Sequence, residues 1–100
     1  MKTLILSLSM ATLLPLTLPA QNGFDVALFG DMPYGTARVP NYERLIADVN
    51  SYNPLFAAHI GDTKSGSTRC DDSHYSDTLG YFNNFFRAVL YSVGDNEWTD

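Results

Sequence analysis

Three short apolar segments set the pattern of the chain, and each of them ends in a glycine followed by an aspartate. They occupy residues 26–31, 55–62 and 88–95. Their closing residues are Asp31, Asp62 and Asp95, so the pattern recurs every 31 to 33 residues, the length of one strand-helix-strand unit. The recurrence predicts three neighbouring parallel strands whose carboxyl ends, and therefore the three aspartates, lie together at one edge of a sheet.

The strands are expected over residues 24–29, 55–60 and 88–93, where the apolar runs are continuous, as in buried parallel strands. After the first strand the apolar spacing changes to that of one helix face, with Tyr42, Leu45, Ile46, Val49 and Tyr52. Pro40 or Asn41 is expected to begin this helix, and Asn53 with Pro54 to end it.

A second helix is expected before the third strand, with Asp72 or Ser73 as its N-cap. Its predicted apolar stripe is Tyr75, Leu79, Phe82 and either Phe85 or Phe86. The order strand, helix, strand, helix, strand with right-handed crossovers predicts an α/β fold with both helices on one face of the sheet. The other face would then be bare, so we expect residues 21–100 to be the N-terminal part of a longer, truncated domain.

The first 20 residues have the organisation of a secretory signal peptide. Lys2 precedes an apolar core over residues 4–14, and Ala20 is a small residue suited to cleavage. The apolar run is shorter than the about 20 residues that a membrane helix needs. We therefore expect residues 1–20 to be a signal peptide and the mature chain to be secreted or periplasmic, with no membrane span.

The charge of the mature chain argues against one class of partner. Removing Lys2 leaves five basic and eleven acidic residues, which changes the formal net charge from −5 to −6. Binding to a nucleic-acid backbone depends on clustered cationic side chains. We therefore expect no nucleic-acid binding.

Carboxylate and amide oxygens at strand ends suit hard metal ions. The three motifs of this chain are Gly30-Asp31-Met32-Pro33-Tyr34, Gly61-Asp62-Thr63-Lys64 and Gly94-Asp95-Asn96-Glu97. Together they resemble the motifs of the calcineurin-like metallophosphoesterases, which include the purple acid phosphatases, over residues 24–100. The resemblance implies that the chain is the N-terminal βαβαβ half of their layered α/β/β/α sandwich. It also implies an exported enzyme that hydrolyses phosphate esters with a metal-bound hydroxide.

The resemblance further implies a dinuclear site of two divalent or trivalent cations, drawn from Mn, Fe, Zn or Mg. In it Asp31 would ligate the first metal, Asp62 would bridge both, and Asp95 or Asn96 would ligate the second. Asp62 and Asn96 are the predicted catalytic positions, since Asn96 stands where the family has its catalytic histidine. The predicted contacts to substrate or metal are Tyr34 and Glu97.

Two departures from the family pattern keep other functions open. Pro33 replaces the histidine of the first motif, and Asn96 cannot transfer protons as a histidine does. One alternative is therefore a degenerate metallophosphoesterase fold that binds without catalysis. Another is an acidic exported domain in which the Gly-Asp pairs only form turns and helix caps. His59 is expected to be buried and hydrogen-bonded, and His74 to be solvated surface.

Overall fold

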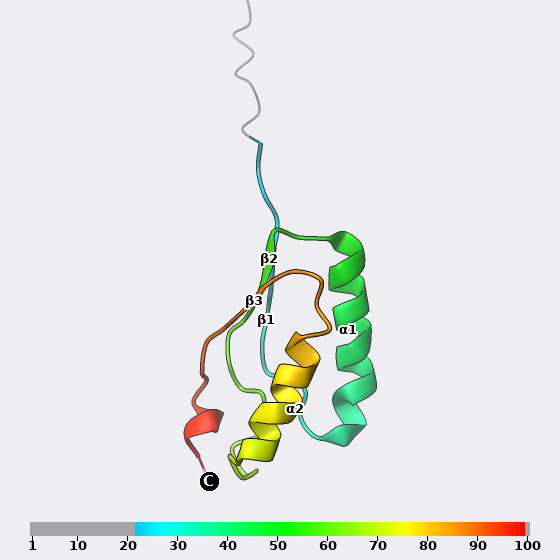
Figure 1. The fold of residues 1–100 in the computed structure, drawn as a ribbon. Helices are drawn as coiled ribbons and strands as arrows, with labels where there is room; N and C mark the ends of the chain where they lie inside the picture. The colour runs from blue at the N-terminus through cyan, green and yellow to red at the C-terminus, as the bar shows by residue number, and fades with distance from the viewer. Residues whose placement is uncertain (1–21, 100) are drawn as a thin grey trace, which may run out of the picture.

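The computed structural model describes residues 22–99, so the predicted signal peptide lies outside the described residues. The elements follow the expected order (Figure 1). They are β1 (Val26–Phe29), η1 (Thr36–Arg38), α1 (Val39–Tyr52), β2 (Phe56–His59), α2 (Asp72–Phe82), β3 (Val89–Tyr91) and η2 (Asn96–Trp98), where η denotes a short 3-10 helix. The chain is thus a small α/β unit, as its sequence predicts, with strands shorter than expected. No helix within residues 22–99 is long and apolar enough to cross a membrane.

The three strands form one parallel sheet in the order β1-β2-β3. In its register Phe29 lies beside His59, and His59 lies beside Tyr91. The Gly-Asp motifs after β1 and β2 therefore leave the sheet at the same level. This register brings the two loops together at the carboxyl edge of the sheet.

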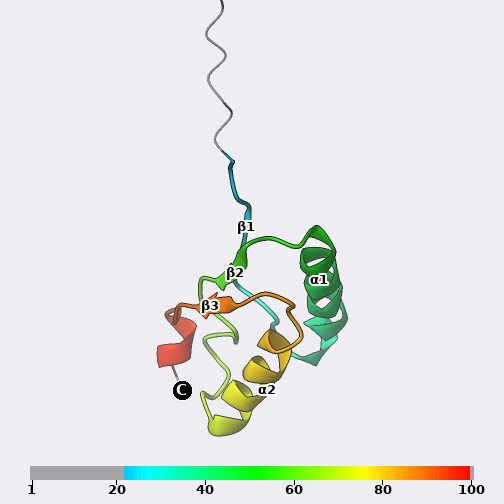
Figure 2. The same cartoon turned by 45° about the horizontal axis from the view of Figure 1, so that its top comes forward.

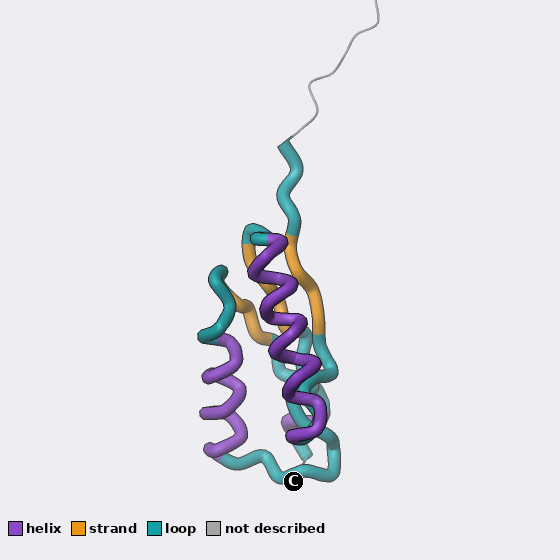
Figure 3. The backbone as a smooth tube through the Cα atoms, turned by 90° about the vertical axis from the view of Figure 1, so that its right-hand side faces the viewer, coloured by secondary structure: helices purple, strands orange, loops and turns teal. Residues whose placement is uncertain are grey.

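Both helices lie on the same face of the sheet (Figures 2 and 3). Strand residues alternate between the two faces, and those on the opposite face keep much of their surface. Leu28 is 68% exposed and Leu90 is 58% exposed. The prediction of one bare face is therefore confirmed for the part of the chain that the structure describes.

The core lies between the sheet and the helices. It consists of Tyr42, Ile46, Ala57 and Phe85. The ring of Phe29 stacks on that of Phe85 with centroids 5.4 Å apart. The predicted stripe of α1 is confirmed except at Tyr52, which is exposed and donates a hydrogen bond to Asp25. Asn53 ends α1 in the left-handed conformation, with its N–H bonded to the carbonyl of Val49.

The second helix presents a different face from the one that its apolar spacing predicts. Tyr75 is exposed and Leu79 is 58% exposed, so the predicted stripe is wrong over its first two members. Phe82 packs against the core, whereas Phe85 is buried only after the helix has ended. The face turned inward carries His74 and Thr78 instead.

The N-cap of α2 is also displaced by one residue from the prediction. Asp71, rather than Asp72 or Ser73, occupies that position, and its Oδ1 accepts hydrogen bonds from the backbone N–H of His74 and the hydroxyl of Ser73. These bonds hold the pKa of the Asp71 carboxyl below its usual value. The ionised side chain also suits the positive end of the helix dipole.

Candidate functional site at the carboxyl edge of the sheet

Two of the motif aspartates share an uncommon backbone conformation. Asp31 has φ 58° and Asp62 has φ 60°, both in the left-handed region. The two loops also bond to each other, because the N–H of Asp31 donates to the carbonyl of Gly61 at 3.1 Å. Left-handed residues other than glycine are sparse in proteins and concentrate at functional sites. Two of them at equivalent strand ends mark this edge as the candidate site.

A chain of hydrogen bonds joins four of the predicted site residues. The Tyr34 hydroxyl donates to Oδ1 of Asp31 at 2.8 Å. The Asn96 side-chain amide donates to the Tyr34 hydroxyl at 3.2 Å, and the Asn96 backbone N–H donates to Oδ1 of Asp62 at 3.1 Å. The structure thus connects Asp31, Tyr34, Asn96 and Asp62 across the ends of all three strands.

Tyr34 acts in this chain as a neutral hydrogen-bond donor. Desolvation and the hydrogen bond to the Asp31 carboxylate raise the pKa of its hydroxyl to about 12. The phenol therefore keeps its proton at neutral pH. Its single proton goes to Asp31 and its oxygen accepts from Asn96, so the hydroxyl holds these two side chains in place.

Asp95 differs from the other two motif aspartates. Its φ is −73°, in the right-handed region, and its side chain is exposed. Within residues 22–99 it forms no side-chain hydrogen bond with Asp31, Tyr34, Asp62 or Asn96. The third motif thus contributes Asn96 to the hydrogen-bonded group, whereas Asp95 stands beside it.

Glu97 is a buried carboxylate that joins the loop after β2 to the loop after β3. It is 5% exposed, and its Oε1 accepts hydrogen bonds from the Thr63 N–H, the Thr63 hydroxyl and the Tyr91 hydroxyl. Its Oε2 accepts from the backbone N–H groups of Asp62 and Gly94. Burial alone would raise the pKa of this carboxyl, but the hydrogen bonds outweigh it and lower the pKa to about 2. All of its described hydrogen bonds are to protein, so Glu97 fixes the loops around Asp62 from within.

Two glycines allow the second and third loops to approach each other. A Cβ on Gly61 would lie 2.5 Å from backbone atoms of Gly94, and Gly61 has φ 110°. A Cβ on Gly94 would collide with the carboxylate and the backbone nitrogen of Asp62. The glycines of these motifs are therefore required by packing against the site as well as by the turns.

His59 is buried and fully hydrogen-bonded, as the sequence predicts. Its Nδ1 accepts from the Gly61 N–H at 3.1 Å, so the proton lies on Nε2, which donates to the carbonyl of Met32 at 3.0 Å. Burial lowers the pKa of this imidazole. A neutral His59 thus ties the second motif to the loop of the first.

His74 is not the solvated residue that its sequence position predicts. It is half-buried, and its Nε2 lies 2.8 Å from the Thr63 hydroxyl. That hydroxyl donates its own proton to Glu97, so His74 must be the donor in this bond. The sequence does contain a signal for this burial, because its polar residues at spacings of three and four share one face of α2. These residues are His74, Asp77, Thr78 and Tyr81.

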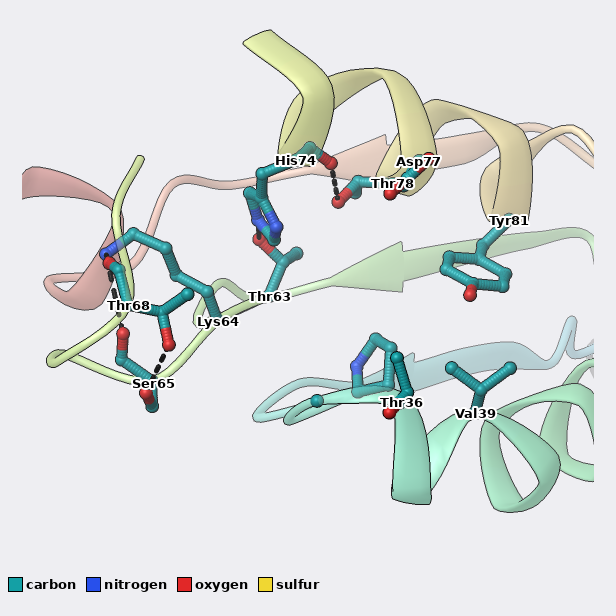
Figure 4. Close-up of a pocket in the computed structure, with 12 residues that line it drawn as sticks. Thr36, Val39, Thr63, Lys64, Ser65, Thr68, His74, Asp77, Thr78 and Tyr81 are labelled. Carbon is teal, nitrogen blue, oxygen red and sulfur yellow. Dashed lines mark hydrogen bonds between the residues drawn. The ribbon is translucent and has the colours of Figure 1, made fainter. Parts of the chain in front are cut away.

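Two cavities adjoin the hydrogen-bonded group. One has a volume of about 210 Å³ and is lined by Asp31, Met32, Tyr34, Arg38, Asn41 and Tyr42. Arg38 is its cationic member, and its guanidinium forms no hydrogen bond or ion pair with another described residue. The other cavity, of about 180 Å³, lies between α2 and the loops after β1 and β2 (Figure 4).

The donor set fits a hard cation only in part. Asp31 and Asp62 supply carboxylates, the ligands that Mg, Mn and related ions prefer. Asn96 would need its side-chain amide turned, because Nδ2 and not the oxygen now faces Tyr34. Residues 22–99 contain no group of three or more His, Cys, Asp or Glu side chains arranged to hold a metal ion.

The chain matches no protein-family model, no curated protein and no solved structure.

Proposed function

We propose that this protein is an exported, metal-dependent phosphoesterase and that the described residues contribute part of its active site. The observation that carries the proposal is the hydrogen-bonded group of Asp31, Tyr34, Asn96 and Asp62, in which both aspartates have the left-handed conformation. Strain of this kind costs on the order of 1–3 kcal/mol per residue, and proteins retain it chiefly where function needs it.

The residues divide into groups that bind cations and groups that bind the ester. The carboxylates of Asp31 and Asp62, with Asn96, would hold the cations. When bound, two such ions clamp phosphoryl oxygens and lower the pKa of water toward about 7. The guanidinium of Arg38 can donate hydrogen bonds to phosphate oxygens in the cavity that it shares with Asp31 and Tyr34. The positive charge of Arg38 explains how an acidic chain could still bind an anionic ester.

Asp62 provides the sharpest test of this proposal. We would purify the exported protein and measure its bound metal, its rate with phenyl phosphate and its thermal midpoint, for the wild type and for Asp62→Asn. The substitution keeps the oxygen that accepts the Asn96 N–H but removes the charge. We expect metal content to fall at least tenfold, and the rate to fall with it, while the midpoint moves by less than about 4 °C.

Asp48→Asn is the matched control. Asp48 is exposed in the middle of α1, so its substitution removes the same charge far from the strand ends. It should leave all three quantities unchanged. Wild-type metal content and rate in Asp62→Asn would overturn the proposal and favour the reading in which Asp62 only shapes a turn.

A binding module without catalysis is the second candidate, and Asn96 is the observation that favours it. An amide at the position of the family's histidine cannot transfer a proton to a leaving group. The same experiment separates the two candidates. Stoichiometric metal that depends on Asp62, together with no turnover of any phosphate ester, would support the binding module.

A further inference from the structure

The cavity of about 180 Å³ beside the candidate site is built from three separate segments. The loop after β1 forms one wall, the loop after β2 a second, and α2 the third (Figure 4).

The helix that covers this cavity turns polar side chains toward it. His74, Thr78 and Tyr81 lie on the cavity side of α2, whereas Leu79 is exposed on the other side. A helix that packs only against a core would present its leucine to that core. Within this lining His74 bonds to Thr63 and Thr78 bonds to the carbonyl of His74, so only the remaining polar groups are open to a ligand.

Several lining groups are already satisfied within the protein. The Thr78 hydroxyl donates to the carbonyl of His74, and the hydroxyls of Ser65 and Thr68 bond to each other. The ammonium group of Lys64 donates to the carbonyls of Thr68 and Thr99 and is only 2% exposed. These groups therefore already have partners within the protein.

Three other lining groups keep their hydrogen-bonding capacity. Within residues 22–99, the hydroxyls of Thr36 and Tyr81 and the carboxylate of Asp77 form no hydrogen bond. In Figure 4 the Tyr81 hydroxyl points into the space between α2 and the start of α1. The available groups are thus two hydroxyls and an acceptor at the exposed rim, a set that complements the hydroxyl groups of a ligand.

The cavity borders the residues that would hold the cations. Thr63 follows Asp62 directly, so their Cα atoms lie about 3.8 Å apart. Pro33 and Gly35 flank Tyr34, the residue that bonds to Asp31. The cavity is therefore lined by the same two loops that carry Asp31 and Asp62.

Building on the phosphoesterase proposed above, we propose that this cavity is the subsite for the alcohol part of the ester, and that it takes a small polyhydroxylated alcohol. A cavity of about 150 Å³ holds a molecule of six heavy atoms such as benzene. The present volume therefore fits an alcohol of about six to eight non-hydrogen atoms. An aromatic alcohol of that size would offer no partner to the Tyr81 hydroxyl, which costs affinity.

The first test compares two esters in variants that keep the shape of the cavity. The exported protein would be assayed with glycerol 1-phosphate and phenyl phosphate, as the wild type, as Tyr81→Phe and as Asp77→Asn. We expect KM for glycerol 1-phosphate to rise about threefold in Tyr81→Phe, which loses a hydrogen bond to the alcohol, and about tenfold in Asp77→Asn, which replaces a charge-assisted hydrogen bond with a weaker neutral one. KM for phenyl phosphate should change less than twofold, and Asp48→Asn should change neither.

A second test fills the cavity. Thr36 is exposed at the cavity mouth, so Thr36→Phe can occupy the space without disturbing the core. It should lower kcat/KM for glycerol 1-phosphate at least tenfold and leave methyl phosphate, whose alcohol is one carbon, within twofold. Equal losses on both esters, or no loss on either, would overturn the subsite.

Direct binding separates failure of the subsite from failure of the proposed function. Glycerol titrated into the labelled protein should shift the NMR signals of Thr36 and Tyr81, and Asp77→Asn should weaken that binding about tenfold. If no phosphate ester is hydrolysed but these shifts appear, the phosphoesterase proposal fails and the polyol site stands. If esters are hydrolysed with no glycerol shifts and no change of preference in the variants, the subsite is overturned and the phosphoesterase stands.

Discussion

Replacing Glu97 with glutamine should lower the free energy of unfolding, although the size of the side chain hardly changes. Five hydrogen bonds converge on the two carboxylate oxygens of Glu97, and all of their partners are donors. A glutamine can offer only one oxygen to these donors, and its NH₂ group must face N–H or O–H groups. The loops that carry Asp62 and Gly94 would then lose their common acceptor.

The size of the effect follows from the pKa of Glu97. Despite burial, its hydrogen bonds lower the pKa from 4.5 to about 2. Each tenfold change in an acid constant corresponds to about 1.4 kcal/mol, so the ionised carboxylate adds about 3 kcal/mol to the free energy of unfolding. We expect Glu97→Gln to lose about that amount at pH 7.

The stabilisation that the ionised Glu97 contributes depends on pH. The folded pKa lies below the unfolded one, so this stabilisation is complete above pH 4.5 and is lost as the pH falls from 4.5 toward 2. The difference between wild type and Glu97→Gln should therefore shrink across that range. Urea unfolding at several pH values, with a chelator present to exclude metal, measures both quantities.

Glu43→Gln is the matched control, since Glu43 is exposed on α1. It should change the free energy of unfolding by less than about 0.5 kcal/mol. A Glu97→Gln protein as stable as the wild type without metal, but deficient in metal binding, would refute the structural role and restore the prediction that Glu97 contacts the metal.

Three further predictions concern other parts of the chain. Burial lowers the pKa of His59 in the folded protein, so the unfolded state binds more protons below pH 6.5. The urea midpoint of the wild type should therefore fall between pH 7.5 and pH 5.5, and the midpoint of His59→Gln should depend less on pH. The bare sheet face should cause association of residues 22–100 expressed alone, and Leu28→Lys with Leu90→Lys should reduce light scattering without lowering the free energy of unfolding by more than about 1 kcal/mol. Intact mass of the exported protein should show cleavage close to Ala20, and a mature chain beginning at Met1 would exclude the signal peptide.

The order of elements could be predicted because it depends on local sequence. Alternation between continuous apolar runs and helical spacing placed the three strands and α1 within a few residues of their observed positions. Asn53 and Pro54 ended α1 as expected, because left-handed asparagine followed by proline cannot continue a helix. The bare face followed from the same order, since two crossovers on one face leave the other uncovered.

The orientation of α2 could not be predicted from its own residues. The spacing of Tyr75 and Leu79 predicts an apolar stripe facing the core. In the structure the helix instead turns His74 inward, where the Thr63 hydroxyl accepts a hydrogen bond from its imidazole. The partner that selects this orientation comes from another loop. Periodicity within one helix contains no information about such a partner.

The sequence by itself determined that aspartates follow parallel strands, and so which edge of the sheet carries the candidate site. The tertiary structure decided which side chains meet there: Asn96 and not Asp95 reaches Tyr34, and the buried Glu97 accepts hydrogen bonds from the backbone of Asp62 and Gly94. The reason is physical. Strand ends are fixed by local apolar runs, whereas the contacts of the loops depend on sheet register and on the close approach of Gly61 to Gly94, which join residues more than 30 positions apart.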